Sequence, residues 1–400
     1  MNSHSSDISS EKVIFCKKCV QSNQRPNTSP EFKKSNKIIG KLSFDDDGVC
    51  HPCKYYEKVK SKINWTDREK ELKDLCDKYR DKNKEYDVLV PGSGGKDSIY
   101  VSHLLKTRYN MKPLTVTWAP HMYTDVGLKN LFEWQKLGFD HLLVTPNYQT
   151  HSLLTKLAFK KLLNPFQPFI IGQKNHSPKI ALKYGIELIM YGENNAEVHN
   201  NIDETQTPLM DPKHYSSESE NDKIFLGGCE IDQFQEYKLK KKDLSIYIPY
   251  ERSVYEEKNI KVHFMSYYKK WSPHENYYYV KNICNFNFNP DGRSEGTYTK
   301  FASLDDKTDG QNYFTMLIKF GHGRATNDAC RDIRDGFITR EEAVKLVNKY
   351  DDEFPKKYFQ DFLDYIKISK NEYWETIDQA RPKNLWKQDG NKWILKTKVI

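Results

Sequence analysis

The segment Tyr86-Asp-Val-Leu-Val-Pro-Gly-Ser-Gly-Gly-Lys-Asp-Ser98 decides the fold class of this chain. Its first five residues are mostly branched and apolar, and they predict a buried strand. The run from Ile99 to Leu105 has helical apolar periodicity and predicts a helix directly after the glycines. Glycines let the backbone turn tightly and point its N–H groups at an anion, and the helix N-terminus adds partial positive charge there. The segment therefore predicts a phosphate-binding loop.

The side chains of this loop suit a nucleotide. Lys96 brings a positive charge, and Asp97 is a candidate partner for Mg²⁺. A Walker loop is excluded, because that motif requires Ser or Thr directly after the lysine. The loop instead resembles the Ser-Gly-Gly-x-Asp-Ser signature of the PP-loop ATP pyrophosphatases, in which it holds the β- and γ-phosphates of ATP. The alternative is an ordinary glycine-rich turn. The expected ATP-binding residues of the loop are Ser93, Gly94, Gly95, Lys96, Asp97 and Ser98.

The surrounding sequence predicts an α/β domain. Apolar runs predict further strands over residues 114–118, 141–145 and 186–191, and helices over residues 126–137, 152–163 and 178–184. Strands that alternate with helices of this length form a mostly parallel sheet. Thr66-x-x-Glu69 and Thr339-x-x-Glu342 predict capping boxes at the starts of two other helices. Residues 194–222 are polar and irregular, which indicates an active-site loop or an insertion.

Two positions beyond the loop fit the same nucleotide pocket. Trp118 ends the second predicted strand, where open α/β sheets bind their ligands, although a core aromatic explains it equally well. Gly192 and Glu193 follow the strand over residues 186–191. Gly192 can allow close approach of the nucleotide, and Glu193 can bind Mg²⁺ or orient a nucleophile. An ordinary turn is the equal alternative.

Two Cys-x-x-Cys pairs lie near the N-terminus, Cys16 with Cys19 and Cys50 with Cys53, with 30 residues between them. Four thiolates form the closed tetrahedral set of a structural zinc site. A redox dithiol is the rival interpretation of either pair alone. Two pairs in one short segment with little core favour zinc, with a role in folding rather than in catalysis.

The remaining cysteines are isolated, and each is expected to be a small buried thiol: Cys76, Cys229, Cys284 and Cys330. Cys229 lacks the glycine two residues later that a glutaminase nucleophile requires, since Ile231 stands there. Position 2 is Asn2 rather than a cysteine. The chain therefore contains no recognisable glutaminase of either common kind.

Two polar, glycine-rich stretches mark the C-terminal half, residues 292–310 and 320–336. Arginines in such stretches can bind carboxylate or phosphate in bidentate fashion. Solvated loops with surface ion pairs are the alternative. With the Cys16 pair, the phosphate loop and Tyr191-Gly-Glu-Asn194, three strings resemble the N-acetyl sugar amidotransferase family of bacterial O-antigen and flagellin glycan biosynthesis: Glu295-Gly-Thr-Tyr-Thr-Lys300, Gly323-Arg-Ala-Thr326 and Arg334-Asp-Gly-Phe-Ile-Thr-Arg-Glu-Glu-Ala343.

The resemblance implies an ATP-dependent conversion of an amide to an amidine. The amide oxygen is adenylated with release of pyrophosphate, and ammonia then displaces AMP to give an acetamidino sugar. The implied cofactors are ATP and Mg²⁺, beside structural Zn²⁺, and the implied substrate is an acidic or nucleotide-linked N-acetyl sugar. A separate glutaminase subunit, with a cyclase-like subunit, would supply ammonia. The implied catalytic residues are Lys96, Asp97, Glu193 and Lys300, and the implied substrate-binding residues are Arg293, Glu295 and Arg324.

The sequence predicts four regions: a disordered tail over residues 1–12, a zinc-binding module over 13–62, a PP-loop domain over 63–260 and a mainly helical substrate-binding region over 261–400. The first ten residues lack an apolar signal core, and no stretch reaches the roughly 18 apolar residues of a membrane helix. A cytoplasmic protein without membrane contact is expected. The net charge of +8 favours a polyanionic partner, which nucleotides, sugar acids and RNA all satisfy.

The main alternative function is that of a tRNA-modifying PP-loop enzyme of the thiolase type, which also adenylates an oxygen and often carries zinc knuckles. Such an enzyme usually needs a pair of catalytic cysteines in the PP-loop domain. Cys229 and Cys284 would have to serve, and neither lies in a recognisable motif. Nucleic acid is therefore the less favoured partner. A non-catalytic nucleotide-binding scaffold is a third interpretation, disfavoured by the complete set of polar residues in the loop.

Overall fold

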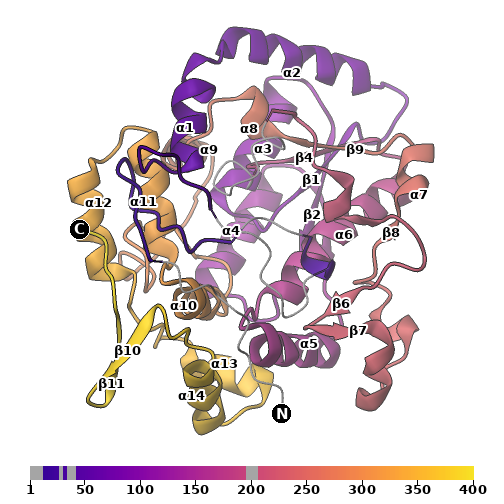
Figure 1. Ribbon diagram of the computed structural model, residues 1–400. Helices are drawn as coiled ribbons and strands as arrows, with labels where there is room; N and C mark the ends of the chain where they lie inside the picture. The colour runs from indigo at the N-terminus through magenta and orange to yellow at the C-terminus, as the bar shows by residue number, and fades with distance from the viewer. Residues whose placement is uncertain (1–11, 27–29, 34–41, 195–205) are drawn as a thin grey trace.

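A five-stranded sheet forms the centre of the computed structural model, which describes residues 12–26, 30–33, 42–194 and 206–400 (Figure 1). The strand order is β3–β2–β1–β4–β9, and every pairing is parallel. This confirms the α/β class and the parallel sheet. The strands are β1 (Val88–Pro91), β2 (Pro113–Trp118), β3 (Asp140–Val144), β4 (Leu188–Tyr191) and β9 (Lys261–Phe264).

The order of the strands determines where a ligand can bind. From β1 the chain runs outward through β2 to β3, then returns to the other side of β1 with β4 and β9. Open α/β sheets bind ligands beyond the carboxyl ends of the strands at such a reversal. The glycine-rich loop follows β1, and Gly192 follows β4. Both predicted segments therefore lie at this point.

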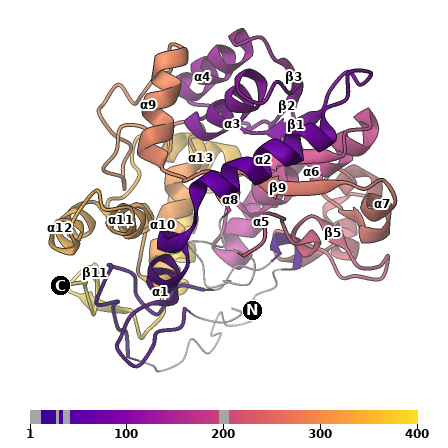
Figure 2. The same cartoon turned by 90° about the horizontal axis from the view of Figure 1, so that it is seen from above.

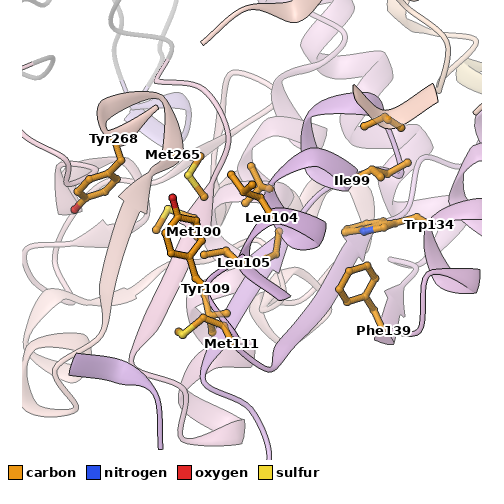
Figure 3. Close-up of a cluster of buried hydrophobic side chains, with 14 of the residues drawn as sticks. Ile99, Leu104, Leu105, Tyr109, Met111, Trp134, Phe139, Met190, Met265 and Tyr268 are labelled. Atoms are coloured by element: carbon orange, nitrogen blue, oxygen red, sulfur yellow. The ribbon is translucent and has the colours of Figure 1, made fainter. Parts of the chain in front are cut away.

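Helices cover both faces of the sheet. On one face, α3 (Lys96–Thr107), α4 (Asp125–Lys136) and α9 (Pro273–Ile283) join a core cluster with the alternate residues Val88 and Val90 of β1. Figure 3 shows side chains of this cluster, with Ile99 close to Trp134. On the other face, α6 (Gln167–Tyr184) contributes Ala181 to the cluster around Leu89 of β1. Burial on both faces explains why the strands read as apolar runs rather than alternating patterns.

The two expected capping boxes have different outcomes. Thr339 is the N-cap of α12 (Arg340–Tyr350): its side chain accepts from Glu342 N at 3.2 Å, and Glu342 Oε2 accepts from Thr339 N at 2.8 Å. That box is confirmed. The box expected from Thr66 to Glu69 is wrong, because α2 (Trp65–Tyr79) begins two residues earlier than a Thr66 cap requires. Asn64 is its N-cap and accepts from Thr66 N at 3.1 Å.

Helix α6 is longer than the sequence predicted. It begins at Gln167 rather than near Pro178, which lies inside the helix. The prediction failed because proline resembles a helix start. The Gln167 side chain stabilises the first turn of α6 through three hydrogen bonds. Its amide nitrogen donates to Glu31 O at 3.0 Å and to Phe225 O at 3.1 Å, and its oxygen accepts from Gly227 N at 2.8 Å.

The C-terminal region is largely helical, as predicted. Figures 1 and 2 show α11 and α12 at the opposite end of the molecule from α7. The sheet continues past the boundary expected at residue 260, since β9 is its fifth strand. The remaining elements are α1 (His51–Lys58), α5 (Tyr148–Leu162), β5 (Ser216–Ser217), β6 (Phe225–Leu226), β7 (Cys229–Glu230), β8 (Tyr250–Glu251), α7 (Arg252–Glu257), α8 (Met265–Tyr268), α10 (Asp309–Phe320), α11 (Arg324–Arg334), α13 (Phe359–Ile366), α14 (Lys370–Gln379), β10 (Trp386–Asp389) and β11 (Lys392–Leu395).

Helix α5 joins the sheet domain to the C-terminal helices. Its Phe159 stacks on Tyr373 of α14 with ring centroids 5.1 Å apart, inside a cluster that also holds residues of α10 and α13. Within the described residues, no helix combines the length and apolar character needed to cross a bilayer. The expected tail, apart from residue 12, and residues 195–205 of the expected active-site loop lie outside the described residues.

Candidate functional site

The phosphate loop is packed so tightly that glycine is required at two positions. A Cβ at Gly92 would lie 2.1 Å from Ser98 Cβ, and a Cβ at Gly94 would lie 2.6 Å from Leu131 Cα. Gly94 also has a φ of +82°, which side chains rarely adopt. Gly95 is the N-cap of α3. The loop therefore leads into the N-terminus of a twelve-residue helix, whose first N–H groups have no acceptor within the helix.

Lys96 and Asp97 interact with each other at the start of α3. Lys96 Nζ lies 2.7 Å from Asp97 Oδ2, and Asn276 of α9 donates to Asp97 Oδ1 at 2.9 Å. Burial alone would raise the pKa of Asp97. The positive charge of Lys96 and the hydrogen bonds outweigh burial and hold this pKa below its ordinary value. Asp97 is therefore an ionised carboxylate at neutral pH, as a Mg²⁺ ligand must be.

A carboxylate from the C-terminal region reaches the loop. Ser93 Oγ donates to Asp305 Oδ2, and a Cβ at Gly95 would lie 3.7 Å from the same oxygen. The backbone of Asp305 packs on Gly127 of α4, where a Cβ would lie 2.6 Å from Asp305 Cα. The sequence prediction missed Asp305 as a site residue. Three aspartates within residues 305–309, inside a polar stretch already noted, were the available signal.

These aspartates have unusual proton affinities. Burial raises the pKa of Asp305 to about 6, although its hydrogen bond from Ser93 opposes the change. Burial raises the pKa of Asp306 to about 7, and the pKa of Asp309 is raised for the same reason. A bound cation would favour their charged forms. The segment from Asp305 to Asp309 thus brings negative charge that the protein alone does not fully neutralise.

Gly192 and Glu193 lie beside the loop, as expected. A Cβ at Gly192 would lie 3.7 Å from Asp97 Cβ and 2.9 Å from the ring of Trp271. Glu193 Oε1 forms an ion pair of 2.6 Å with Arg331 of α11. Arg331 was not among the predicted site residues, although it lies in the second polar stretch. After Lys96 and the hydrogen bonds, the positive charge of Arg331 also lowers the pKa of Asp97, so this ion pair lies near the start of α3.

Arg324 is held by its own helix. Arg324 Nε donates to both carboxylate oxygens of Asp328, at 3.0 and 2.9 Å, and a second nitrogen donates to Tyr313 OH. Burial would lower its pKa, but Asp328, Tyr313 and Asp309 raise that pKa well above the ordinary value. Its charge is thus permanent and already balanced. A ligand that binds Arg324 has to compete with Asp328.

Lys300 lies among aromatic rings. Its Nζ is 5.2 Å from the ring centroids of both Tyr277 and Phe288. Tyr277 stacks on Phe301 at 5.0 Å, and Lys96 Nζ lies 5.3 Å from the centroid of Phe301. The two lysines are therefore separated by a layer of two aromatic rings. The structure brings Lys300 near the loop without direct contact between the lysines.

Arg293 and Glu295 line a cleft of about 400 Å³. Arg293 forms a bidentate ion pair with Glu353, with nitrogen–oxygen distances of 2.6 and 2.7 Å, and its guanidinium stacks on Tyr350 at 4.3 Å. Glu295 accepts from Lys357 N at 3.1 Å. Arg324 does not line this cleft. The three predicted substrate-binding residues therefore fall in two places.

The same cleft extends toward the phosphate loop. Its wall includes Asp306, the chain neighbour of the loop-facing Asp305, and the first residues of α4. Its two lysines are ion-paired, as Lys357 Nζ lies 2.5 Å from Asp291 and Lys307 Nζ lies 2.8 Å from Asp361. The cleft is therefore polar, and each of its three cations has a carboxylate partner.

Trp118 is packed as a core residue. Its side chain is 5% exposed, and a Cβ at Gly172 of α6 would lie 2.1 Å from its ring. His176 and Tyr247 flank the indole, with ring centroids 5.5 and 5.6 Å away. The core interpretation explains these contacts. Within the described residues, the buried indole N–H has no hydrogen-bond partner.

The four cysteines form one buried cluster. The Sγ atoms of Cys16, Cys19, Cys50 and Cys53 lie within 4.8 Å of one another, and Cys19 Sγ is 3.6 Å from Cys50 Sγ. A tetrahedral zinc ion with Zn–S bonds of about 2.3 Å sets its ligands about 3.8 Å apart. The cluster thus fits a structural zinc ion. With four thiolates and complete burial, it offers no open coordination position.

The thiolase alternative requires two cooperating cysteines, and the structure separates them. Cys229 is 1% exposed in the cluster around Trp118, on the α6 side of the sheet. Cys284 packs against the cluster on the α3 side, and burial raises the pKa of its thiol to about 11. Opposite faces of a sheet cannot bring two thiols to one substrate atom. This arrangement argues against a cysteine-pair mechanism.

Comparison with known proteins identifies the C-terminal region. Residues 295–399 match the family "LPS biosynthesis protein WbpG-like, C-terminal domain". This match covers less than half of the chain, and it shows that the C-terminal region is similar to that family. The matched residues include Asp305, which accepts from Ser93 of the phosphate loop, and Arg331, which pairs with Glu193.

Among solved structures, the chain matches the NH3-dependent NAD synthetase from Campylobacter jejuni subsp. jejuni NCTC 11168 in complex with the nitrate ion. The two share 15% sequence identity over 34% of this chain, with a TM-score of 0.28. The aligned part of this chain spans 59% of the length of that synthetase. No curated protein matches the chain.

Proposed function

We propose that this protein is an ATP-dependent amidotransferase that converts the N-acetyl group of a sugar to an acetamidino group. The observation that carries the proposal is the hydrogen bond from Ser93 to Asp305. It joins the phosphate loop of the sheet domain to the WbpG-like domain, residues 295–399. A loop that binds ATP and a domain of lipopolysaccharide biosynthesis thereby share one site.

The loop suits the departure of pyrophosphate. The N–H groups at the start of α3 and the charge of Lys96 can stabilise the negative charge that develops as the α–β phosphate bond breaks. Asp97 and Asp305 approach the loop from different elements, and their oxygens are the ligands that Mg²⁺ prefers. Mg²⁺, when bound, would neutralise charge on the phosphates. Glu193 is a third carboxylate at this position.

The cleft with Asp306 in its wall suits the sugar. Hydroxyl groups of a sugar need both donors and acceptors, and the paired charges of the cleft supply both. Arg293 and Glu295 belong to this wall, and we propose that they contact the sugar. The acetamido group would face Asp305 and the α-phosphate of ATP.

The chemistry has two steps. The amide oxygen attacks the α-phosphate, so that an O–P bond forms and pyrophosphate leaves. Ammonia then adds to the imidate carbon, and the C–O bond to AMP breaks to give the amidine. The protein holds the reactants in line, which is its largest contribution to such reactions. Since the chain has no recognisable glutaminase, ammonia would come from a separate glutaminase subunit, with a cyclase-like subunit.

The test is AMP formation from Mg-ATP with ammonium chloride, across a panel of acetamido sugars, nucleotide-linked acetamido sugars and bulk tRNA. We expect AMP only with a sugar, together with a product one mass unit lighter, as replacement of oxygen by NH requires. AMP formation that depends on tRNA would refute the proposal and favour the thiolase type. ATP binding without turnover on any of these substrates would favour the nucleotide-binding scaffold.

A further inference from the structure

Helix α11 carries two sets of polar residues on different faces. Arg324, Asp328 and Arg331 are spaced by four and three residues and therefore share one face. Asn327 and Cys330 share another face, roughly 90° away around the helix. The first face points to the nucleotide site, because Arg331 pairs with Glu193 at 2.6 Å.

The second face contacts the cysteine cluster. Cys330 is 2% exposed and shares a core cluster with the four metal-binding cysteines, within hydrogen-bond reach of Cys19. Arg25, from the segment between the two Cys-x-x-Cys pairs, donates to Asn327 Oδ1 at 2.7 Å. One short helix thus connects the cluster with the site of Glu193.

The helix is fixed along its length. Ala325 and Ala329 are completely buried on its third face, and Asp351 accepts from Gly323 N at 2.7 Å and from Thr326 N at 3.0 Å at its N-terminus. A packed helix of eleven residues moves as a unit rather than bending. A shift of Cys330 therefore moves its neighbour Arg331.

We propose that metal binding at the cysteine cluster positions Arg331 through α11 and thereby sets the affinity of the protein for Mg-ATP. Arg331 is a positioning residue, which acts on the nucleotide through Glu193. Without metal, four buried thiols have no common ligand, and the short module that supports Asn327 and Cys330 loses its organising centre. The inference rests on the proposed function only in that the phosphate loop binds ATP.

The experiment compares the zinc-loaded full-length chain with the same chain after removal of zinc by a chelator and dialysis. Zinc content is measured by a colorimetric assay of released zinc, and Mg-ATP affinity is measured by calorimetry. Amide hydrogen exchange is measured over residues 324–334. We expect removal of zinc to weaken Mg-ATP binding at least tenfold and to accelerate exchange in α11, while β1 and β2 keep their protection. Unchanged affinity in a zinc-free chain with native circular dichroism would overturn the inference.

Two variants keep the inference testable if removal of zinc unfolds the chain. The double variant Asn327→Ala with Cys330→Ala cuts the contacts of α11 with the module. At full zinc content it should bind Mg-ATP several-fold more weakly than the wild type. The matched control is Cys76→Ala, which removes another buried thiol from the sheet core. Equal affinity of the double variant and the control would overturn the inference.

Arg331→Gln and Arg331→Lys separate positioning from general stability. When Asn327→Ala and Cys330→Ala are added to Arg331→Gln, Mg-ATP affinity should not fall further. The cluster acts on the nucleotide through Arg331, and that side chain is already lost in this variant. Arg331→Lys keeps the positive charge and should recover part of the affinity. If the combined variant instead loses Mg-ATP affinity by the sum of the two separate losses, the inference is overturned. Absence of ATP binding by the zinc-loaded wild type would instead overturn the proposed function together with it.

Discussion

The phosphate loop and the C-terminal cleft both combine glycines with charged residues, but they hold their charges differently. In the loop, the anion-binding groups are mainly backbone N–H groups at the start of α3, which have no acceptor within the helix. In the cleft, the cations are ion-paired: Arg293 with Glu353, Lys307 with Asp361 and Lys357 with Asp291. A cation in a sequence is therefore weaker evidence for a ligand site than a glycine pattern before a helix.

Lys96→Met gives the largest expected effect, because Lys96 brings the positive side-chain charge of the loop. AMP formation should fall by roughly 10²- to 10³-fold, the usual cost of losing one group that stabilises a transition state. Lys136→Met is the matched control, since Lys136 lies exposed on α4. An initial-rate assay for AMP measures both. Comparable activity of the two variants would show that the loop does not act on phosphate.

Asp305→Asn tests whether the C-terminal region takes part in the loop. The variant keeps the shape of the side chain but loses its charge, so it should raise the Mg²⁺ concentration needed for half-maximal AMP formation by roughly 10- to 100-fold. Asp352→Asn is the control, because Asp352 belongs to the same region and is half-exposed. A Mg²⁺ titration that coincides with the wild type would assign Asp305 to packing alone.

The sequence predicted the part of the site that depends on local geometry. The loop, its helix and the strand before it are encoded in consecutive residues, and the two cysteine pairs are recognisable from their spacing. It could not predict Asp305 or Arg331, because their partners Ser93 and Glu193 lie more than a hundred residues away. Nor did it show that Arg293 is paired with Glu353, since that depends on how α12 and its following loop fold back.

Asp306 lies in the segment, residues 305–309, that borders both the phosphate loop and the cleft. Comparing Asp306→Asn with the wild type at different pH values tests the buried charge of this segment. The pKa of Asp306 is raised to about 7 in the folded state, above its ordinary value near 4. The folded state therefore binds more protons than the unfolded state in this range, and the contribution of Asp306 to stability falls as pH rises from 4 to 7. Asp306→Asn should melt at a higher temperature than the wild type at pH 8.

The advantage of Asp306→Asn should shrink at pH 5, where the wild-type carboxyl is largely protonated in the folded state. Thermal unfolding of both proteins at the two pH values measures the difference. Asparagine can still accept the hydrogen bonds from Thr308, so the fold is preserved. An equal difference in melting temperature at pH 5 and pH 8 would contradict the raised pKa.

Glu353→Gln gives the smallest expected effect. It breaks the charge balance around Arg293 in the cleft, where both side chains are about 30% exposed. Exposed ion pairs contribute little, so the free energy of unfolding should fall by about 0.5–1 kcal/mol. Urea denaturation measures this change. A loss above about 3 kcal/mol would indicate a buried ionic network, and the contrast between the cleft and the loop would weaken.

The order of the strands also has a consequence for synthesis of the chain on the ribosome. Strand β4 pairs on its outer side with β9, which follows about 70 residues later, or roughly 4–14 s at 5–20 residues per second. Arg331, the partner of Glu193, emerges about 70 residues later still. The nascent chain therefore holds the phosphate loop beside an incomplete sheet, before Asp305 and Arg331 have been synthesised. Nucleotide binding would be completed only after Arg331 has been synthesised.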